Sequence, residues 1–318
     1  MSSSTVERFL VILGDIGSLF KAIWVAIPVF LAASLVISSP SLYAGEVLLL
    51  EKNGIRVFFG PNHEQAAKEV ADIYPELRSE LKGVFGWDLS EGTSVLLVGD
   101  RRQFRKMTGN DLIVAFAVPK RDLVVIDHSK MNIDPFSLRN ILKHELCHLL
   151  LHQHIKIEPL PRWLDEGVAQ WVSDGVGDII FDQKRSLLNR AAFTDSFIPI
   201  SALRRDFPRN NYDLILAYEE SKSLVDYIIG RFGKEGMLDI LRHMRRGESD
   251  RVAVLRSVLI SLNELEEDWH RSLRQKMRWF AYLSYYLYEI LFVFAALVTV
   301  YASIKIVLRK RAYMKEME

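Results

Sequence analysis

Two segments carry the strongest signal in this chain: KHELCHLLLHQH at residues 143–154 and PRWLDEGVAQW at residues 161–171. His144 and His148 are four residues apart in an otherwise apolar run that has helical spacing. Side chains four apart lie one above the other on a helix, so these two imidazoles can bind one cation. Glu145 projects beside them and can reach a water on that cation without being a ligand itself.

The second segment offers a third ligand. Glu166 follows His148 by 18 positions and lies on a second predicted helix. A carboxylate from a neighbouring helix would complete three ligands and leave the fourth position to water, as in a catalytic zinc site. The HExxH pattern alone is weak, and the alternative is a solvated polar helix face. The apolar surroundings favour the metal site, because buried imidazoles need partners.

Upstream of these helices the sequence predicts a small sheet. Asp134-Pro135 is expected to open the HExxH helix, as N-cap and first-turn residue. Apolar periodicity predicts the preceding elements: strand 55–59, helix 63–85 with Pro75 as a candidate kink, strand 95–98, helix 100–107, and a hairpin of 112–118 with 123–126.

Composition narrows the class of protein. The 318 residues carry 41 basic and 40 acidic side chains, and the single cysteine, Cys147, excludes an intrachain disulfide. Residues 1–44 hold two basic and two acidic groups and residues 279–318 hold five and three, which leaves 34 basic and 35 acidic in 45–278. This balance excludes a nucleic-acid-binding polycation, and 49% hydrophobic residues exclude a disordered chain.

Both ends of the chain are apolar. Residues 22–37 read AIWVAIPVFLAASLVI, and residues 1–44 are interpreted as a signal peptide cleaved after Ala44 or as an uncleaved membrane anchor. Residues 280–304 contain one charge, Glu289, and are long enough to cross a bilayer.

We therefore expect a transmembrane helix over 279–305 and a basic cytoplasmic tail over 306–318; the alternative is an apolar helix in an oligomer core. Because basic residues mark the cytoplasmic side, residues 45–278 are predicted to lie on the extracytoplasmic side of the cell membrane. The expected fold class is α+β: a small mixed sheet with the HExxH helix, followed by a mostly helical C-terminal half and flanked by terminal transmembrane segments.

HELCH followed by PRWLDEGVAQW resembles the gluzincin clan of zinc peptidases, most closely its peptidase MA-like branch. The likeness continues in AYEESKSLVDYIIGRFG from Ala217 and SLNELEEDWHRSL from Ser261. It covers about residues 53–278, which implies a metallopeptidase domain over 45–278.

The resemblance implies roles for five residues. His144, His148 and Glu166 would bind one Zn²⁺ ion, and Glu145 would act as the general base. Tyr218 is similar in position to a tyrosine that stabilises the transition state in aminopeptidases of the clan, so its hydroxyl could donate to the developing oxyanion. The alternative is a tyrosine that only packs.

Two features depart from the related peptidases. Some gluzincins carry an aspartate four residues after the glutamate ligand to orient a histidine, whereas this chain has Gln170, and Asp165 is expected to point elsewhere on its helix. The acidic motif with which aminopeptidases hold a free amine has no counterpart, since residues 113–119 read IVAFAVP. This favours an endopeptidase, whose extended substrate would pair with an edge strand at 113–118.

The cysteine and the other histidines are not expected to bind the metal. Cys147 should face the core, because a thiolate ligand would close the open coordination position. His152 and His154 are assigned to a solvated helix end. The remaining histidines have no ligand spacing and are assigned to the surface: His63, His128, His243 and His270.

The sequence therefore predicts a membrane-anchored zinc-dependent peptidase. Its expected partners are a peptide or protein substrate and the lipid bilayer, and no nucleic acid. One alternative is an inactive, zinc-stabilised, membrane-tethered interaction module. Glu145 argues against it, because a structural metal site needs ligands but no base. A second alternative is a structural membrane protein without metal.

Overall fold

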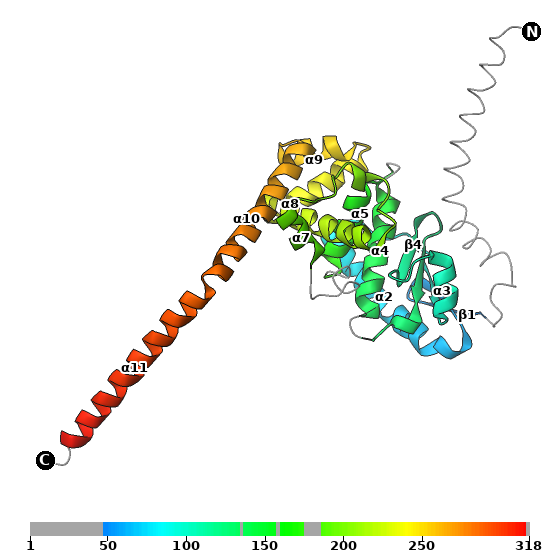
Figure 1. The fold of residues 1–318 in the computed structure, drawn as a ribbon. Coiled ribbons are helices and arrows are strands. Elements are labelled where there is room, and N and C mark those ends of the chain that lie inside the picture. Colours follow the sequence, from blue (N-terminus) through cyan, green and yellow to red (C-terminus); the bar gives the residue numbers. More distant parts are fainter. Residues whose placement is uncertain (1–46, 134–135, 157–159, 175–185, 316–318) are drawn as a thin grey trace, which may run out of the picture. The chain divides into compact units, whose positions relative to one another are not determined.

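The computed structural model describes residues 47–133, 136–156, 160–174 and 186–315 (Figure 1). The chain divides into two compact units. Among the described residues, the larger unit contains everything up to residue 174 together with Ile198–Leu262, and the smaller contains Ser186–Phe197 and the chain from Asn263. The segment 1–44, predicted to be a signal peptide or anchor, lies outside the described residues.

A five-stranded mixed sheet forms the first part of the larger unit. Its spatial order is β1-β2-β3-β5-β4, with β2, β3 and β5 parallel and the two edge strands antiparallel to their neighbours. The strands are β1 (Leu48–Lys52), β2 (Ile55–Phe59), β3 (Ser94–Val98), β4 (Ala115–Val118) and β5 (Leu123–Asp127). The predicted small mixed sheet is confirmed.

Strand β1 is additional to the predicted strands. It pairs with β2 through the turn Asn53-Gly54, where both residues have positive φ, 57° and 80°. Asn-Gly at such a turn is a strong hairpin signal, because both residues tolerate this conformation. The signal for β1 was therefore present in the sequence.

Helices pack on both faces of the sheet. On one face, α3 (Arg101–Thr108) inserts Phe104 among strand residues. Side chains alternate along a strand, so the intervening residues face the other way, towards α2 (Glu64–Phe85) and α4 (Leu138–His154), which contact the sheet (Figure 1). The core under α3 consists of Leu96, Val98, Leu123 and Val125 around Phe104.

The start of α4 differs from the prediction. Asp134 and Pro135, expected to open this helix, lie outside the described residues, and α4 begins at Leu138 with Ser137 at the N-cap position. Pro75 lies inside α2 and does not end it. The body of α4 is where the apolar spacing placed it, because eleven of its residues are buried, which fixes which side faces the sheet.

The rest of the larger unit is helical. It contains α5 (Arg162–Val172), α8 (Asn211–Arg245) and α9 (Asp250–Val258), and α5 contacts both α4 and α8. Gly167 allows the closest approach, since a Cβ there would lie 2.4 Å from the carbonyl oxygen of Ser221 on α8. A glycine is therefore needed where α5 crosses α8, and the crossing holds the preceding residue, Glu166, towards α4.

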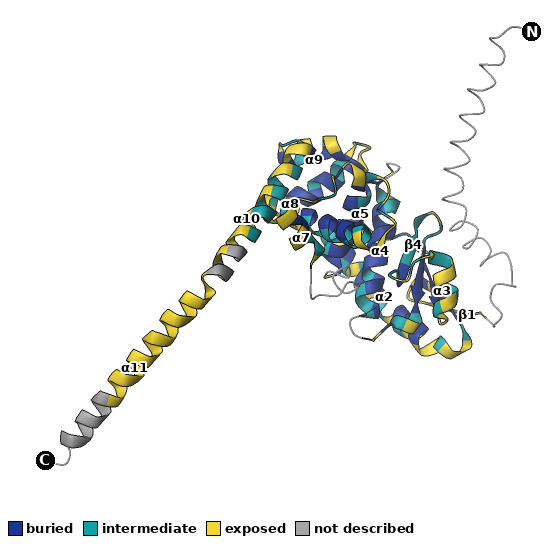
Figure 2. Ribbon diagram, viewed as in Figure 1, coloured by how far each residue is buried: buried dark blue, intermediate teal, exposed yellow. Residues whose placement is uncertain are grey.

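The smaller unit contains three helices, α7 (Leu187–Thr194), α10 (Leu262–Tyr285) and α11 (Leu287–Lys315). Residues 287–306 of α11 are exposed along their whole length (Figure 2). Within the part of the chain that the structure describes, this is the single helix long and apolar enough to cross a membrane. It begins later than the predicted span, because the first residues of that span continue α10.

Candidate metal centre

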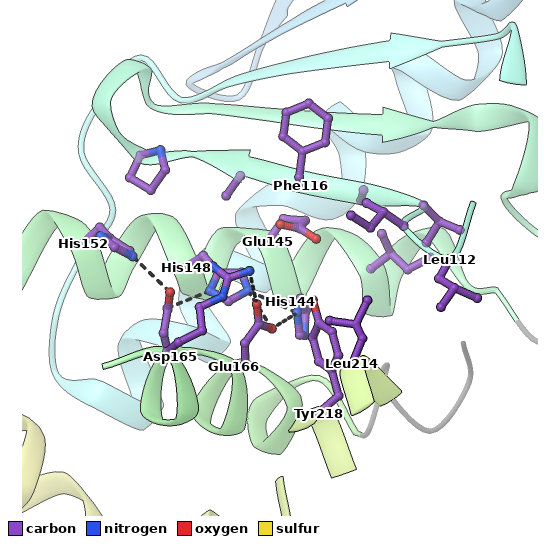
Figure 3. Close-up of a pocket in the computed structure, with 17 residues that line it drawn as sticks. Leu112, Phe116, His144, Glu145, His148, His152, Asp165, Glu166, Leu214 and Tyr218 are labelled. Carbon is purple, nitrogen blue, oxygen red and sulfur yellow. Dashed lines mark hydrogen bonds and ion pairs between the residues drawn. The ribbon is translucent and has the colours of Figure 1, made fainter. Parts of the chain in front are cut away.

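Helix α4 presents His144 and His148 on one face, towards α5 (Figure 3). Both side chains are buried, and their ring centroids lie 4.8 Å apart with the rings nearly perpendicular. Their Nε2 atoms are 3.2 Å apart. The four-residue spacing therefore brings both imidazoles to one point, as expected for a helix.

Glu166 reaches the same point from α5. Its Oε2 atom lies 3.6 Å from Nε2 of His144 and 3.5 Å from Nε2 of His148. Among the described residues, these three form the one group of three or more His, Cys, Asp or Glu side chains whose candidate ligand atoms lie within 4.8 Å of one another. Two helices thus bring the three predicted ligands together.

The outer nitrogen of each histidine is hydrogen-bonded. Nδ1 of His148 lies 2.7 Å from Oδ1 of Asp165, and Nδ1 of His144 lies 3.3 Å from Oγ of Ser173. The Ser173 hydroxyl donates its proton to the carbonyl oxygen of Ala169, so it accepts from His144. Both Nδ1 atoms are therefore assigned the proton, which leaves a lone pair on each Nε2.

The inner atoms of this cluster fit a zinc ion. The two Nε2 atoms face a carboxylate oxygen, and Oε2 of Glu166 has no hydrogen-bond partner among the described residues. Buried acceptors in contact are unfavourable unless a positive charge joins them. Ligand atoms at zinc bond lengths in a tetrahedron are about 3.3 Å apart. The separations of 3.2, 3.5 and 3.6 Å agree with this value.

Two ionised carboxylates supply negative charge at the cluster. Burial opposes ionisation of Glu166, but Arg162 and the two histidines hold its pKa well below the usual range. Burial likewise opposes ionisation of Asp165, and His148 and His152 hold its pKa well below the usual range. The two carboxylates can therefore balance a divalent cation.

Glu145 is buried beside the cluster and lines the same pocket (Figure 3). Burial raises the pKa of this carboxyl, with a further contribution from the carboxylate of Glu166. A raised pKa makes the Glu145 carboxylate a stronger base. A general base accepts protons most effectively when its pKa lies close to the working pH, so the rise favours this role. Its position suits proton transfer to and from a molecule in the pocket.

The pocket lies between β4, α4, α5 and α8 and has a volume of about 250 Å³. The N–H of Asp127 donates to the carbonyl oxygen of Val114, and Ala115 lies opposite Ile126. In an antiparallel pair, this register turns the backbone groups of Ala115 and Ala117 away from β5. The free edge of the sheet therefore offers hydrogen-bonding groups along the pocket.

Tyr218 reaches the pocket from α8, near His144 and Glu166 (Figure 3). Burial raises the pKa of its hydroxyl, and the Glu166 carboxylate raises it further, so the hydroxyl keeps its proton as a donor. Arg162 donates a hydrogen bond to Tyr218. The ring also makes an edge contact with Phe207 at 5.2 Å between centroids.

Comparison with known proteins identifies the family. The family model for the Peptidase MA superfamily matches residues 109–275, which is more than half of the chain and includes every element that lines the pocket. The chain belongs to the Peptidase MA superfamily. The His-His-Glu cluster of this Peptidase MA member is consistent with a single zinc site.

Solved structures that resemble this Peptidase MA member are longer proteins. Aminopeptidase A from Legionella pneumophila is 12% identical with a TM-score of 0.44, over 71% of this chain and 27% of that one. Leukotriene A4 hydrolase from Saccharomyces cerevisiae is 13% identical with a TM-score of 0.40, over 67% of this chain and 35% of that one. A variant M1 zinc metallopeptidase from Deinococcus radiodurans is 15% identical with a TM-score of 0.37, over 72% and 50%. This chain therefore spans half or less of each protein. No curated protein matches the sequence.

The expectation that Asp165 points elsewhere on its helix is wrong for this Peptidase MA member. Its Oδ1 bonds His148 and its Oδ2 lies 3.1 Å from Nε2 of His152 (Figure 3). Asp165 and Glu166 are neighbours on α5, and α5 lies so close to α4 that one carboxylate reaches the inner nitrogen of His148 and the other its outer nitrogen. Gln170 instead donates to the carbonyl oxygen of Tyr218, at 3.1 Å.

Other side-chain assignments also change. His152 and His154 are partly buried rather than solvated, since His152 pairs with Asp165 and His154 hydrogen-bonds the carbonyl oxygen of Asp88 at 2.8 Å. Cys147 is fully buried, as expected, and burial raises the pKa of its thiol, so it is no thiolate ligand. The histidines assigned to the surface are all partly buried: His63, His128, His243 and His270.

Ser173 and Arg162 contact the cluster and were not among the predicted site residues. Ser173 lies seven positions after Glu166, two helical turns along the same face of α5, and Arg162 lies one turn before it. This spacing is the signal by which both could have been found. Both positions can be predicted by extending the helix face that carries Glu166 one turn backwards and two turns forwards.

Proposed function

We propose that this chain is a membrane-anchored zinc-dependent endopeptidase. The observation that carries the proposal is the convergence of two imidazole Nε2 atoms and one buried carboxylate oxygen, which accepts no hydrogen bond among the described residues, beside a buried glutamate. In this proposal His144, His148 and Glu166 are the metal ligands, and Glu145 is the general base.

The chain's own residues would carry the proton transfers of peptide hydrolysis. Zinc bound at the cluster would supply a Lewis acid that lowers the pKa of water to about 7 and polarises a carbonyl. Glu145 would accept a proton from the attacking water on its carboxylate and later deliver it to the leaving amine. Asp165 and Ser173 would keep both imidazoles in the tautomer that presents Nε2.

Tyr218 is proposed as a donor to the developing oxyanion. Its hydroxyl keeps its proton and lies in the same pocket as Glu145. Gln170 on α5 and Arg162 hold the tyrosine from two sides, through its carbonyl and its hydroxyl. A fixed donor aimed at developing charge stabilises a transition state without having to reorganise.

Endopeptidase action is proposed from the outward backbone groups of β4 and from the side chains on this edge of the pocket. The outward backbone groups of Ala115 and Ala117 on β4 suit an extended peptide that adds as a further strand. The pocket-lining residues on β4 and in the segment just before it carry no acidic side chain to hold a free amine: Leu112, Ile113, Val114, Ala115, Phe116 and Ala117. Backbone pairing tolerates many side chains, so broad sequence preference is expected.

Membrane attachment is proposed from α11, whose apolar side chains are exposed over Leu287–Ile306. In this layout residues 45–278 form the catalytic domain, 279–305 include the transmembrane helix, and 306–318 form a cytoplasmic tail. Basic residues follow the apolar helix, which supports an extracytoplasmic catalytic domain in the cell membrane.

The deciding experiment uses peptides with an acetylated N-terminus and an amidated C-terminus. The purified full chain in detergent should cleave them internally, whereas an exopeptidase would cleave only unblocked versions. Glu145→Gln should lower kcat/KM by about 10²- to 10⁴-fold while zinc content stays at that of the native chain. Turnover unchanged by Glu145→Gln would remove Glu145 from the mechanism. No turnover by the native zinc-loaded chain would favour the inactive zinc-stabilised interaction module instead.

A further inference from the structure

The two oxygens of Glu166 have different partners. Oε1 lies 2.9 Å from Nη2 of Arg162, one turn earlier on α5, whereas Oε2 faces the two Nε2 atoms and accepts no hydrogen bond among the described residues. A carboxylate with both oxygens free can bind a metal through one or through both. Here one oxygen is already occupied by a cation of the chain itself.

Arg162 is held in place by three contacts. Besides Glu166, it donates to the hydroxyl of Tyr218, and its guanidinium carbon lies 5.6 Å from the ring centroid of Phe207. A guanidinium is a rigid fork of five donors, so it can bind two acceptors at once, and it stacks against aromatic rings. A lysine ammonium in its place would keep the charge but not this geometry.

We propose that Arg162 is a positioning residue that keeps Glu166 bound to the metal through a single oxygen. The inference deepens the proposed function and rests on its ligand assignment. With Oε1 occupied, only Oε2 is available to the metal, and the remaining coordination positions stay open for water and substrate. Without Arg162, Oε1 is free to approach the metal as well, or the carboxylate is free to rotate away.

The test compares Arg162→Met, Arg162→Lys and the native full chain, all purified in detergent. Zinc release to an excess of a chromogenic chelator should change by about ten- to a hundredfold in Arg162→Met: faster if the Glu166 carboxylate rotates away, and slower if both of its oxygens bind the metal. Arg162→Lys should fall between Arg162→Met and the native chain. After replacement of zinc by Co²⁺, the visible absorption should change in Arg162→Met, since four- and five-coordinate Co²⁺ absorb with different intensity.

Lys68→Met is the matched control, because it removes another cation-to-glutamate pair one helical turn apart. Lys68 lies 2.7 Å from Glu64 on α2, away from the pocket, and both side chains are exposed. It should release zinc at the native rate with the native Co²⁺ spectrum. If Arg162→Met does not fold by circular dichroism, Arg162→Lys decides.

The inference is overturned if folded Arg162 variants release zinc at the native rate and give the native Co²⁺ spectrum, or if Lys68→Met changes both as much. Its failure differs from failure of the proposed function. A native chain that holds zinc and cleaves blocked peptides, with Arg162 variants unchanged, removes only the role of Arg162. A native chain that binds no zinc removes the ligand assignment and the inference together.

Discussion

At the scale of single residues, the geometry of the cluster depends on the hydrogen bonds that its carboxylates and imidazoles make on the side away from the proposed metal. Asp165 bonds Nδ1 of His148 and Nε2 of His152, so it orients His148 with its Nε2 atom towards Glu166. Such outer partners set the direction and the basicity of metal-binding imidazoles. Removing the partner should weaken the site although no proposed ligand is lost.

Asp165→Asn tests this. The amide keeps one acceptor for His148 but loses the negative charge and the second acceptor, so zinc affinity should fall by about ten- to a hundredfold in a chelator competition assay. Asp174→Asn is the control, since Asp174 is exposed and asparagine tolerates its positive φ of 56°. Native zinc affinity in Asp165→Asn would show that the Asp165–His148 contact has no part in metal binding.

At the scale of elements, the crossing of α5 and α8 holds the site together. Gly167 lies at this crossing, next to the proposed ligand Glu166, and α8 carries Tyr218. A Cβ at Gly167 would meet the Ser221 carbonyl oxygen at 2.4 Å and Cγ2 of Val225 at 2.6 Å. Neither helix can absorb this without moving, because the first contact is with backbone.

Gly167→Ala should therefore destabilise the fold by about 1–3 kcal/mol in thermal or denaturant unfolding, and it should also weaken zinc binding. Gly230→Ala on α8 is the matched control, because no described residue beyond the adjoining turns of its own helix lies within 4 Å of a Cβ there. Alanine favours helix over glycine, so this control should leave stability equal or slightly higher. Equal stabilities for the two variants would contradict the close crossing.

Helix α10 carries a pH-sensitive contact outside the metal centre. His270 stacks on Phe197 with 4.0 Å between ring centroids, and its Nε2 is buried without a hydrogen-bond partner among the described residues. Burial, followed by the charge of Arg274, lowers the pKa of His270 to about 4. The unfolded chain takes up a proton near pH 6.5, so the stability from this contact is complete above that pH and is lost as the pH falls towards 4.

The measurement is the difference in Tm between pH 7.5 and pH 5 for the native chain and for His270→Phe. Phenylalanine keeps a ring against Phe197 but cannot bind a proton, so the variant should lose less Tm on acidification than the native chain does. All other titrating groups are shared and cancel in the comparison. A native chain that loses no more Tm than the variant would refute the buried neutral imidazole.

At the scale of the whole molecule, α11 is the proposed membrane anchor. Its described residues 287–306 expose apolar side chains on every side, as a helix in lipid does. The full chain should therefore stay with membranes in alkaline carbonate and be released by detergent. A chain of residues 45–278, which lacks both apolar ends, should appear in the soluble fraction, whereas a chain of residues 45–318 should stay with membranes. Release of the full chain by carbonate alone would exclude a transmembrane α11.

Much of the scaffold could be predicted from local sequence. Short apolar runs located β2, β3 and the hairpin of β4 with β5, and helical spacing located α4 and brought His144 and His148 to one face. These are local properties, because the period of a strand or helix depends only on the residues within it. Strand β1 was overlooked although the Asn53-Gly54 turn signals it.

Sequence by itself determined the three groups proposed to bind the metal and the base beside them, because helical periodicity fixes two and a recognisable second segment supplies the third. Only the tertiary structure decided which neighbouring side chains bond these groups and fix their orientation. Asp165 rather than Gln170 orients His148, and Arg162 occupies one oxygen of Glu166. The reason is physical: the sequence gives the face on which a side chain lies, but how closely two helices approach, and so which atom a side chain reaches, depends on packing such as that at Gly167.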